Sequence, residues 1–296
     1  MKRHYVLFLA AMAVFWGLCA LTTPQAAAQE AKKAKVLHFT RSQGFEHGPA
    51  KLLEDGTTIS GRALKKYLAK KNIEVVETQD GGVFDGNLDQ YDGFIFYTSG
   101  NLQDPAGSKN DKAKPISESG LRKAYDAVRG GKGFVGIHSA TDSHCNLKDN
   151  DGVDLYTKFI GARFATHGAQ QFATLTVAEP TAFPFLKESG KHITTWDEWY
   201  AMHQYNNDLH VILVQETADM EGAKEYGRPP FPASWIRQEG KGRVGYTSFG
   251  HDDWYFKNTD NVRRIAELVE WSVGRFDADT TPNIEKVTPR FAEMPK

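Results

Sequence analysis

The sequence predicts an α/β fold with a mostly parallel sheet, helices on both faces of the sheet and an antiparallel extension. Four segments of the first half are apolar without alternation, as expected of parallel strands covered on both faces. They are residues 35–40, 73–78, 94–97 and 133–137. Helical patterns at 59–71 and 117–128 complete a β-α-β-β-α-β order. Residues 172–177 alternate like a half-exposed strand, which predicts the antiparallel extension.

Composition and charge are those of an ordinary globular protein. The 296 residues are 40% hydrophobic and 25% charged, which is ample for a buried core. We expect one domain over residues 35–275, with a linker at 29–34 before it and a loosely held polar tail at 276–296 after it. The formal net charge of −1 indicates neither a nucleic-acid partner nor attraction to an anionic membrane.

Residues 1–28 have the pattern of a secretory signal peptide. A basic start at Lys2 and Arg3 precedes an apolar run over residues 5–21, and three alanines at 26–28 form a cleavage site. The alternative is an uncleaved anchor, but the run is short for a membrane-spanning helix. We therefore expect cleavage near Ala28, export to the periplasm or the cell exterior, and no membrane partner after cleavage.

Each predicted element of the first half has a local signal. In the helix at 59–71, Leu64, Tyr67 and Leu68 share one face. The polar segment 101–117 predicts a loop at the rim of the sheet. Glycines at 130 and 131 end the second helix, as glycine often does.

The second half holds shorter elements. We expect helices at 155–160 and 183–189, strands at 172–177, 194–200, 211–215, 233–237 and 243–247, and a last helix at 260–273. The glycine-rich turn at 238–242 predicts that the last two strands form a hairpin.

Polar and aromatic residues gather after several of the predicted strands. The clusters are Arg41, Glu46 and His47; His138, Ser139 and Asp142; Asp197, Glu198, Trp199 and Tyr200; and His251, Asp252 and Trp254. His167 lies in a loop between them. Ligands of open α/β sheets bind at the carboxyl ends of the strands. The clusters therefore predict one functional site at that edge.

Histidines beside carboxylates suit acid–base chemistry near neutral pH. We expect the catalytic groups to be His138, Glu198, His251 and His167. Aromatic side chains next to charged groups suit a sugar, whose ring faces stack while its hydroxyls form hydrogen bonds. The residues expected to bind this small-molecule substrate are Arg41, His47, Ser139, Asp142, Asp197, Trp199, Tyr200, Asp252 and Trp254.

Three alternatives stay open. A zinc site is one, since imidazoles and a carboxylate are common zinc ligands; its members would be His138, His167, His251 and Glu198. Asp197 and Glu198 alternate in the predicted strand, so only one of them would face the pocket. Asp252 could instead cap the helix that follows it.

The sequence lacks the motifs of several common functions. The sequence has no G-x-x-x-x-G-K-[ST] loop, no G-x-G-x-x-G after the first strand and no G-x-S-x-G elbow. After signal cleavage Cys145 is the only cysteine, so no intramolecular disulfide can form. Cys145 lies beyond the end of the strand at 133–137, which disfavours a role as nucleophile.

Four motifs occur in an order that a known family shares. They are Gly44-Phe45-Glu46-His47, the run Gly-Lys-Gly-Phe-Val-Gly-Ile-His-Ser-Ala at 131–140, Asp197-Glu198-Trp199-Tyr200, and Gly-Lys-Gly-Arg-Val at 240–244 with Gly250-His251-Asp252. Over about residues 35–274 the chain resembles the trehalose-utilisation (ThuA-like) family. The resemblance implies the class I glutamine amidotransferase-like fold, a flavodoxin-like sheet with helices on both faces.

The resemblance also bears on chemistry. True amidotransferases carry a cysteine nucleophile in the turn where this chain has His138, and imidazole cannot form the glutamyl thioester. The resemblance therefore implies carbohydrate catabolism without glutamine amidotransferase activity. The substrate would be a disaccharide or its 3-keto derivative, with a sugar oxidoreductase as a pathway partner and a lyase, isomerase or hydrolase reaction. A non-catalytic sugar-binding protein and a zinc-dependent hydrolase are the alternatives.

Overall fold

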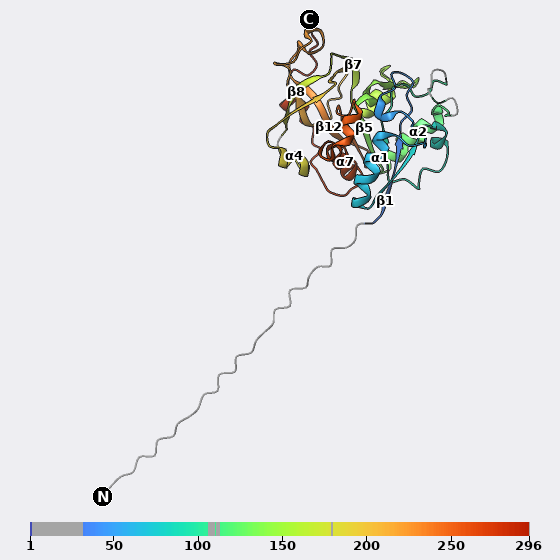
Figure 1. The fold of residues 1–296 in the computed structure, drawn as a ribbon, viewed down its shortest axis with the longest axis horizontal. Coiled ribbons are helices and arrows are strands. Elements are labelled where there is room, and N and C mark those ends of the chain that lie inside the picture. Colours follow the sequence, from blue (N-terminus) through green and yellow to red (C-terminus); the bar gives the residue numbers. More distant parts are fainter. Residues whose placement is uncertain (2–31, 106–109, 111–112, 179, 296) are drawn as a thin grey trace. The chain divides into compact units, whose positions relative to one another are not determined.

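The computed structural model describes residues 1, 32–105, 110, 113–178 and 180–295 (Figure 1). Residues 2–28 of the expected signal peptide and residues 29–31 of the expected linker lie outside the described residues. Within the described part, no helix combines the length and the apolar character that a membrane crossing requires.

A nine-stranded sheet forms the centre of the described residues. Its order is β2-β1-β3-β5-β13-β12-β11-β8-β9. The strands are β1 Ala34–Phe39, β2 Ile73–Thr78, β3 Gly93–Phe96, β5 Gly133–Ile137, β8 Gln171–Val177, β9 His192–Asp197, β11 His210–Gln215, β12 Phe231–Glu239 and β13 Gly242–Thr247. The five strands from β2 to β13 are parallel, and those from β12 to β9 are antiparallel to their neighbours. The predicted parallel sheet with an antiparallel extension is confirmed.

The register of the parallel strands brings their carboxyl ends together. Phe96 of β3 pairs with Gly136 of β5, and Ile137 pairs with Thr247 of β13. Since β3, β5 and β13 end at the same level, the segments that follow them meet at one edge of the sheet.

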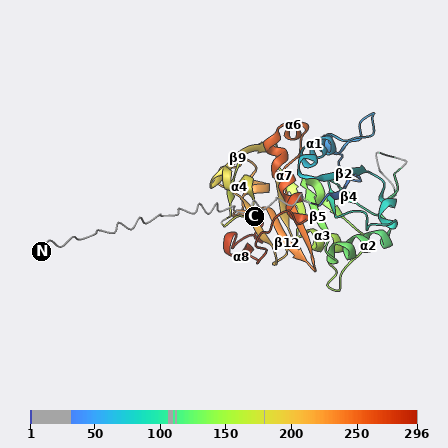
Figure 2. The ribbon, with the colours of Figure 1, turned by 90° about the horizontal axis from the view of Figure 1, so that it is seen from below.

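Helices cover both faces of the parallel strands (Figure 2). α1 (Ile59–Leu68) and α7 (Thr259–Ser272) pack on one face, while α2 (Glu118–Arg129) and α3 (Leu155–Ile160) pack on the other. The strands supply both cores by alternation: Val135 and Ile137 belong to the first, and Phe134 belongs to the second. Burial of both faces explains why these strands are apolar throughout.

The predicted strand 194–200 is wrong in one respect that matters for the site. β9 ends at Asp197, and the chain resumes as β10 (Tyr200–His203), which pairs with β7 (Arg163–His167) in a separate two-stranded sheet. The break follows from Asp197, whose carboxylate accepts a hydrogen bond from the backbone N–H of Glu198. This bond turns the chain out of the ladder and separates Glu198 from the strand.

Short elements join the larger ones. They are the 3-10 turns η1 Gly48–Ala50, η2 Ala69–Lys71, η3 Gly81–Asp85 and η4 His138–Asp142, the strands β4 Gly100–Asn101 and β6 Ser143–His144, and the helices α4 Pro184–Ser189, α5 Ala223–Tyr226, α6 Asp253–Lys257 and α8 Ile284–Val287. The tail from 276 is not loosely held, as expected from its composition, but packs on the domain. Asn283 exchanges hydrogen bonds with the backbone of Val211, and Ile284 is buried.

A buried histidine in β1 makes stability depend on pH. Burial lowers the pKa of His38 to about 4, against a smaller opposing effect of Glu77. The unfolded chain therefore takes up a proton at His38 near pH 6.5 while the folded chain does not. Stability from this residue is complete above pH 6.5 and is lost as the pH falls toward 4.

We predict that urea unfolding of the wild-type protein loses up to about 3 kcal/mol more between pH 7 and pH 4.5 than that of His38→Gln, which cannot be protonated. Comparing the pH slopes of the two proteins removes the effect of the titrating groups that do not interact with His38. Equal slopes would show that His38 does not stay neutral in the folded protein.

Candidate active site

The turn after β5 holds His138 in an unusual backbone conformation. His138 has φ +44° and a fully buried side chain, a combination that is uncommon outside glycine and is concentrated at functional sites. Its Nδ1 lies 2.8 Å from the carbonyl oxygen of Ser248. Because a carbonyl oxygen only accepts, Nδ1 donates this hydrogen bond, and Nε2 faces the site.

Three imidazole rings meet at this point. His47, in the segment between β1 and η1, and His251, which follows β13, bring their rings within 4.8 Å and 5.3 Å of the ring centre of His138. The centres of His47 and His251 lie 5.1 Å apart. All three ring pairs are close to perpendicular, so the rings converge edge to face around one small volume.

Glu198 completes the cluster. One carboxylate oxygen, Oε2, lies 3.0 Å from Nδ1 of His251 and 3.6 Å from Nε2 of His138. The other oxygen, Oε1, lies 3.1 Å from Nδ1 of His167 on β7. Burial alone would raise the pKa of Glu198, but hydrogen bonds and charges of His138 and His251 outweigh it and hold the pKa well below its usual range.

The pKa values of two of the histidines are shifted in opposite directions, although Glu198 acts to raise both. Burial and the neighbouring imidazoles lower the pKa of His47 to about 2, so its ring is neutral. Burial also acts to lower the pKa of His251, but its hydrogen bond to Glu198 and the charge of that group raise the pKa overall. The site therefore combines a neutral buried ring with an ion-paired one.

The carboxylate of Asp197 connects two of the backbone segments that carry site residues. Its buried carboxylate accepts hydrogen bonds from three backbone N–H groups, those of Gly250 (2.9 Å), His251 (3.1 Å) and Glu198 (2.9 Å). Gly250 has φ +112°, which a residue with a Cβ rarely adopts. Burial raises the pKa of Asp197 despite these bonds and the charge of His138.

Tyrosines and one phenylalanine surround the rings. Tyr200 packs against His138 with ring centres 4.2 Å apart and ring planes tilted by 39°, and its hydroxyl lies 3.4 Å from Nε2 of His47. Tyr97, directly after β3, donates its hydroxyl to the carbonyl of Gly250. Phe45 packs edge-on against His47 at 4.9 Å and is 68% exposed, so it stands at the mouth of the site.

The four groups fit a divalent cation. His47, His138, Glu198 and His251 each offer one ligand atom, and these atoms lie within 4.8 Å of one another. Imidazole nitrogen with a carboxylate oxygen is a donor set that suits zinc and related metals. The hydrogen bond from His138 to a backbone carbonyl is the outer contact that orients metal-binding histidines. Among the described residues, Nδ1 of His47 is buried without a hydrogen-bond partner.

A comparison with protein families gives a match to the model described as "ThuA: Trehalose utilisation" over residues 35–272. This range spans the central sheet and every ring of the histidine cluster. The chain belongs to the ThuA family. No curated protein sequence matches this ThuA-family chain.

Two solved ThuA-like structures share its fold. One, from Parabacteroides merdae, has a TM-score of 0.62 at 14% identity and covers 84% of this chain and 92% of its own. The other, from Bacteroides uniformis, has a TM-score of 0.57 at 19% identity and covers 83% of this chain and 96% of its own. At these identities the likeness establishes the α/β fold of the ThuA-family protein and leaves its chemistry to the site itself.

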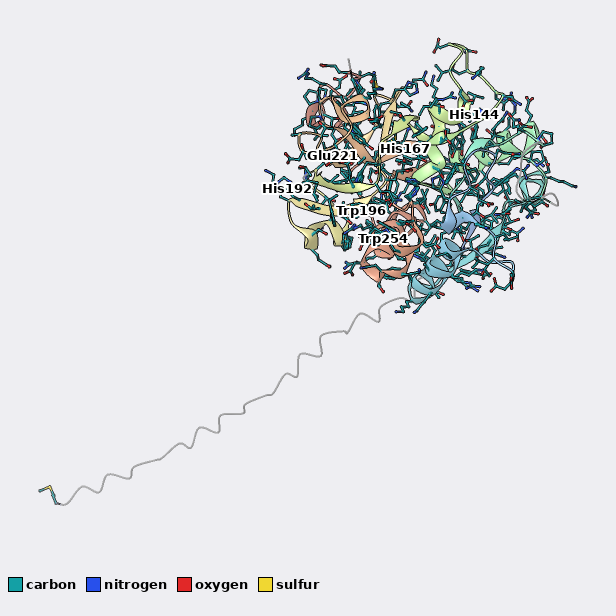
Figure 3. The ribbon with its side chains drawn as sticks, turned by 45° about the horizontal axis from the view of Figure 1, so that its top comes forward. His144, His167, His192, Trp196, Glu221 and Trp254 are labelled. Carbon is teal, nitrogen blue, oxygen red and sulfur yellow. The ribbon has the colours of Figure 1, made fainter. Side chains whose placement is uncertain are left out.

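The structure brings most of the predicted site residues together. His138, Glu198, His251 and His167 are joined by direct contacts, with His47 and Tyr200 beside them. His167 is the exposed member of the group and lies at the surface in Figure 3. Of the two acids that alternate in the sequence, Glu198 enters the cluster and Asp197 binds the backbone beneath it.

Three of the predicted substrate-binding residues are placed elsewhere. Arg41 is buried and donates to the backbone carbonyls of Ala113 and Asp104, so it holds these two positions of the chain together. Ser139 is buried in the turn η4. Trp199 is fully buried in the hydrophobic core, because the break after Asp197 turns its ring inward. All three side chains are buried, and their roles in substrate binding stay predictions.

Other predicted residues lie around the cluster. Burial raises the pKa of the Asp142 carboxyl, which feels the opposing charges of His144 and Arg163. Asp252 stands at the N-cap position of α6, but its side chain makes no capping hydrogen bond. Trp254 is partly buried against the core. Their roles stay predictions.

Cys145 is no nucleophile in this geometry. It is buried, and burial together with the charge of Asp154 raises the pKa of its thiol. The thiolate is therefore disfavoured.

Sequence patterns did not reveal three contributors: the Ser248 carbonyl, the Tyr97 hydroxyl and the Phe45 ring. Every residue has a carbonyl, so the first leaves no signal. Tyr97 ends an apolar strand and looks like core. Phe45 had a usable signal, since a large aromatic residue beside His47 in a polar loop is out of place.

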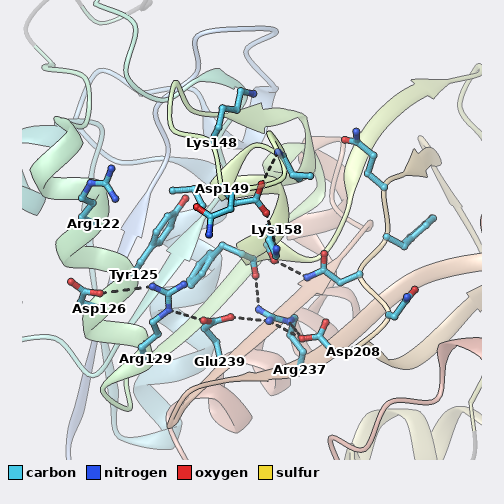
Figure 4. Close-up of a pocket in the computed structure, with 18 residues that line it drawn as sticks. Arg122, Tyr125, Asp126, Arg129, Lys148, Asp149, Lys158, Asp208, Arg237 and Glu239 are labelled. Atoms are coloured by element: carbon cyan, nitrogen blue, oxygen red, sulfur yellow. Dashed lines mark hydrogen bonds and ion pairs between the residues drawn. The ribbon is translucent and has the colours of Figure 1, made fainter.

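A large cavity lies elsewhere on the molecule (Figure 4). It has about 930 Å³ and is lined by residues of α2, α3 and β12. Arg129, Glu239, Arg237 and Asp208 form a chain of ion pairs along it. Since these charges satisfy one another, the chemistry of the molecule is better placed at the histidine cluster.

Removing the Asp197 carboxylate tests how much the site depends on it. Asp197→Ala leaves three backbone N–H groups without their acceptor, and each buried unpaired donor costs about 1–3 kcal/mol. We expect the free energy of unfolding to fall by about 3 kcal/mol or more, and by less in Asp197→Asn, which keeps one acceptor oxygen. Guanidinium unfolding followed by tryptophan fluorescence measures both. Wild-type stability in Asp197→Ala would contradict this role.

Proposed function

We propose that this protein is an exported, metal-dependent enzyme of carbohydrate catabolism that acts on a disaccharide or its 3-keto derivative. The observation that carries the proposal is the convergence of three imidazoles and one carboxylate within 4.8 Å at the carboxyl edge of the sheet. This edge is where open α/β sheets bind their ligands. The pattern of the first 28 residues supports export, and the family description supports a sugar.

A divalent cation would be held by His47, His138, Glu198 and His251. When bound, it polarises an oxygen atom of the substrate and stabilises the negative charge that forms there during proton abstraction. The donor atoms are already oriented for this task, because Ser248 sets the tautomer of His138 and Asp197 holds the backbone of His251 and Glu198.

Acid–base chemistry falls to groups that face the solvent side of the cluster. A 3-keto sugar has acidic hydrogens next to its carbonyl group, and removing one leads to enolisation, isomerisation or elimination. His167 contacts Glu198 through Nδ1 and is 43% exposed, so its ring can accept or return a proton at the substrate. A sugar oxidoreductase would supply the 3-keto sugar.

The strongly lowered pKa of Glu198 favours this enzyme over a non-catalytic sugar-binding protein. A binding groove needs polar groups of ordinary pKa, whereas perturbed carboxylates in contact with several histidines are typical of reactive or metal-binding sites. A histidine at position 138 also leaves no thiol for glutamine hydrolysis.

The test uses protein purified without chelator. We expect about one divalent metal ion per chain by plasma mass spectrometry, and turnover of 3-keto-trehalose, followed by NMR, that stops with EDTA and returns with added metal. His138→Ala should lose the metal and at least about 10³-fold of the activity, as expected when a ligand of a catalytic metal is removed. Circular dichroism should show that its fold is retained.

Leu52→Ala is the control, because Leu52 is an exposed side chain outside the cluster and outside the β8–β9 face. It should keep wild-type metal content and activity. Absence of turnover with and without added zinc or manganese would overturn the proposed reaction. Turnover of an unoxidised disaccharide to free monosaccharides would instead identify a metal-dependent hydrolase.

A further inference from the structure

The antiparallel edge of the sheet presents an aromatic surface near the cluster. Phe172 on β8 is 65% exposed and Trp196 on β9 is 37% exposed. The two residues are direct cross-strand partners, and their rings meet edge to face with centres 5.3 Å apart. Phe172 and the outer part of Trp196 together leave contiguous aromatic surface open to solvent, and such a patch is a candidate contact for a ligand.

The same face continues as a row of polar pairs. Thr174 and Thr194 share a hydrogen bond of 3.0 Å, and Thr176 contacts His192 at 3.2 Å. The opposite face of the two strands, by contrast, is apolar and belongs to the core; its members are Ala173, Leu175, Val177 and Ile193. The outer face thus combines apolar rings with hydroxyl groups, which is the combination that recognises sugars.

Trp196 is held ready for such a contact. Its indole N–H donates to Oε1 of Gln170 at 3.0 Å, so the polar end of the ring is satisfied within the protein. Gln170 lies three residues after His167 in the segment that joins β7 to β8. This bond fixes the ring and leaves its apolar surface to a ligand.

The aromatic surface adjoins the catalytic cluster. Only Asp197 separates Trp196 from Glu198, so their Cα atoms lie at most about 7 Å apart. A sugar whose reacting ring sits at the cluster can therefore place its next ring over Trp196.

We propose that Phe172 and Trp196 form a sugar-binding subsite that holds the non-reacting ring of the substrate. The inference rests on the proposed function for the position of the reacting ring, and it goes further by assigning the second ring to the β8–β9 face. The substrate is then a di- or oligosaccharide derivative, and a monosaccharide cannot use the subsite.

The test measures binding without catalysis. In ¹H–¹⁵N spectra of the purified protein, trehalose or maltotriose should shift the indole signal of Trp196, assigned with Trp196→Phe, whereas glucose should not. Trp196→Ala and Phe172→Ala should each weaken binding of the larger sugars by about tenfold, the loss expected for one stacked ring face. Leu52→Ala, which removes an exposed apolar side chain elsewhere, should bind as the wild type does.

Three results would overturn the inference. The first is wild-type binding of the larger sugars by both aromatic variants, and the second is no response of Trp196 to any sugar. The third is a wild-type dimer that Trp196→Ala converts to a monomer, since the face would then be a contact between two copies. The binding test uses unoxidised sugars. It can therefore still be interpreted if the proposed reaction on a 3-keto sugar is not found.

Discussion

The carboxylate of Asp197 is the contact on which the site depends. It joins the end of the antiparallel strand β9 to the segment after β13, two regions that are more than fifty residues apart in sequence. The same carboxylate bends the chain at Glu198 and so ends β9. Without it, the segment that carries Glu198 would lose its hydrogen bonds to the backbone of Gly250 and His251. Burying a carboxyl group costs free energy, which its three backbone hydrogen bonds offset. These bonds join the segments that carry Glu198 and His251.

The parallel strands provide the rest of the geometry. β5 is flanked by β3 and β13 in register, so the turn that carries His138 lies beside the segment that carries His251. The left-handed backbone of His138 aims its ring into the space where these segments meet, and the Ser248 carbonyl sets its tautomer. The fold thus brings three imidazole rings and one carboxylate to a single point at the carboxyl edge of the sheet.

Much of this could be predicted from the sequence, because the edge rule for parallel strands requires only knowing where strands end. The apolar run 133–137 with His138 after it, and the histidines after β1 and β13, were placed correctly on that basis. For the second half of the chain, it could not be predicted which side chains enter the core and which face the solvent. Strand alternation offers no means to foresee that Asp197 would break its own strand, turn Trp199 into the core and leave Trp196 outside. The contacts of Arg41 could not be predicted for a similar reason, since a loop arginine that donates to distant backbone carbonyls looks the same in sequence as one that binds a ligand.

The central claim is that His47, His138, Glu198 and His251 together hold one divalent cation. X-ray absorption spectroscopy of the protein loaded with one equivalent of zinc tests it most directly. The structure predicts a first shell with three imidazole nitrogens and a carboxylate oxygen at about 2.0–2.2 Å, with the outer-shell scattering that histidine rings produce. A shell of oxygen atoms without imidazole scattering would place the metal elsewhere and contradict the account.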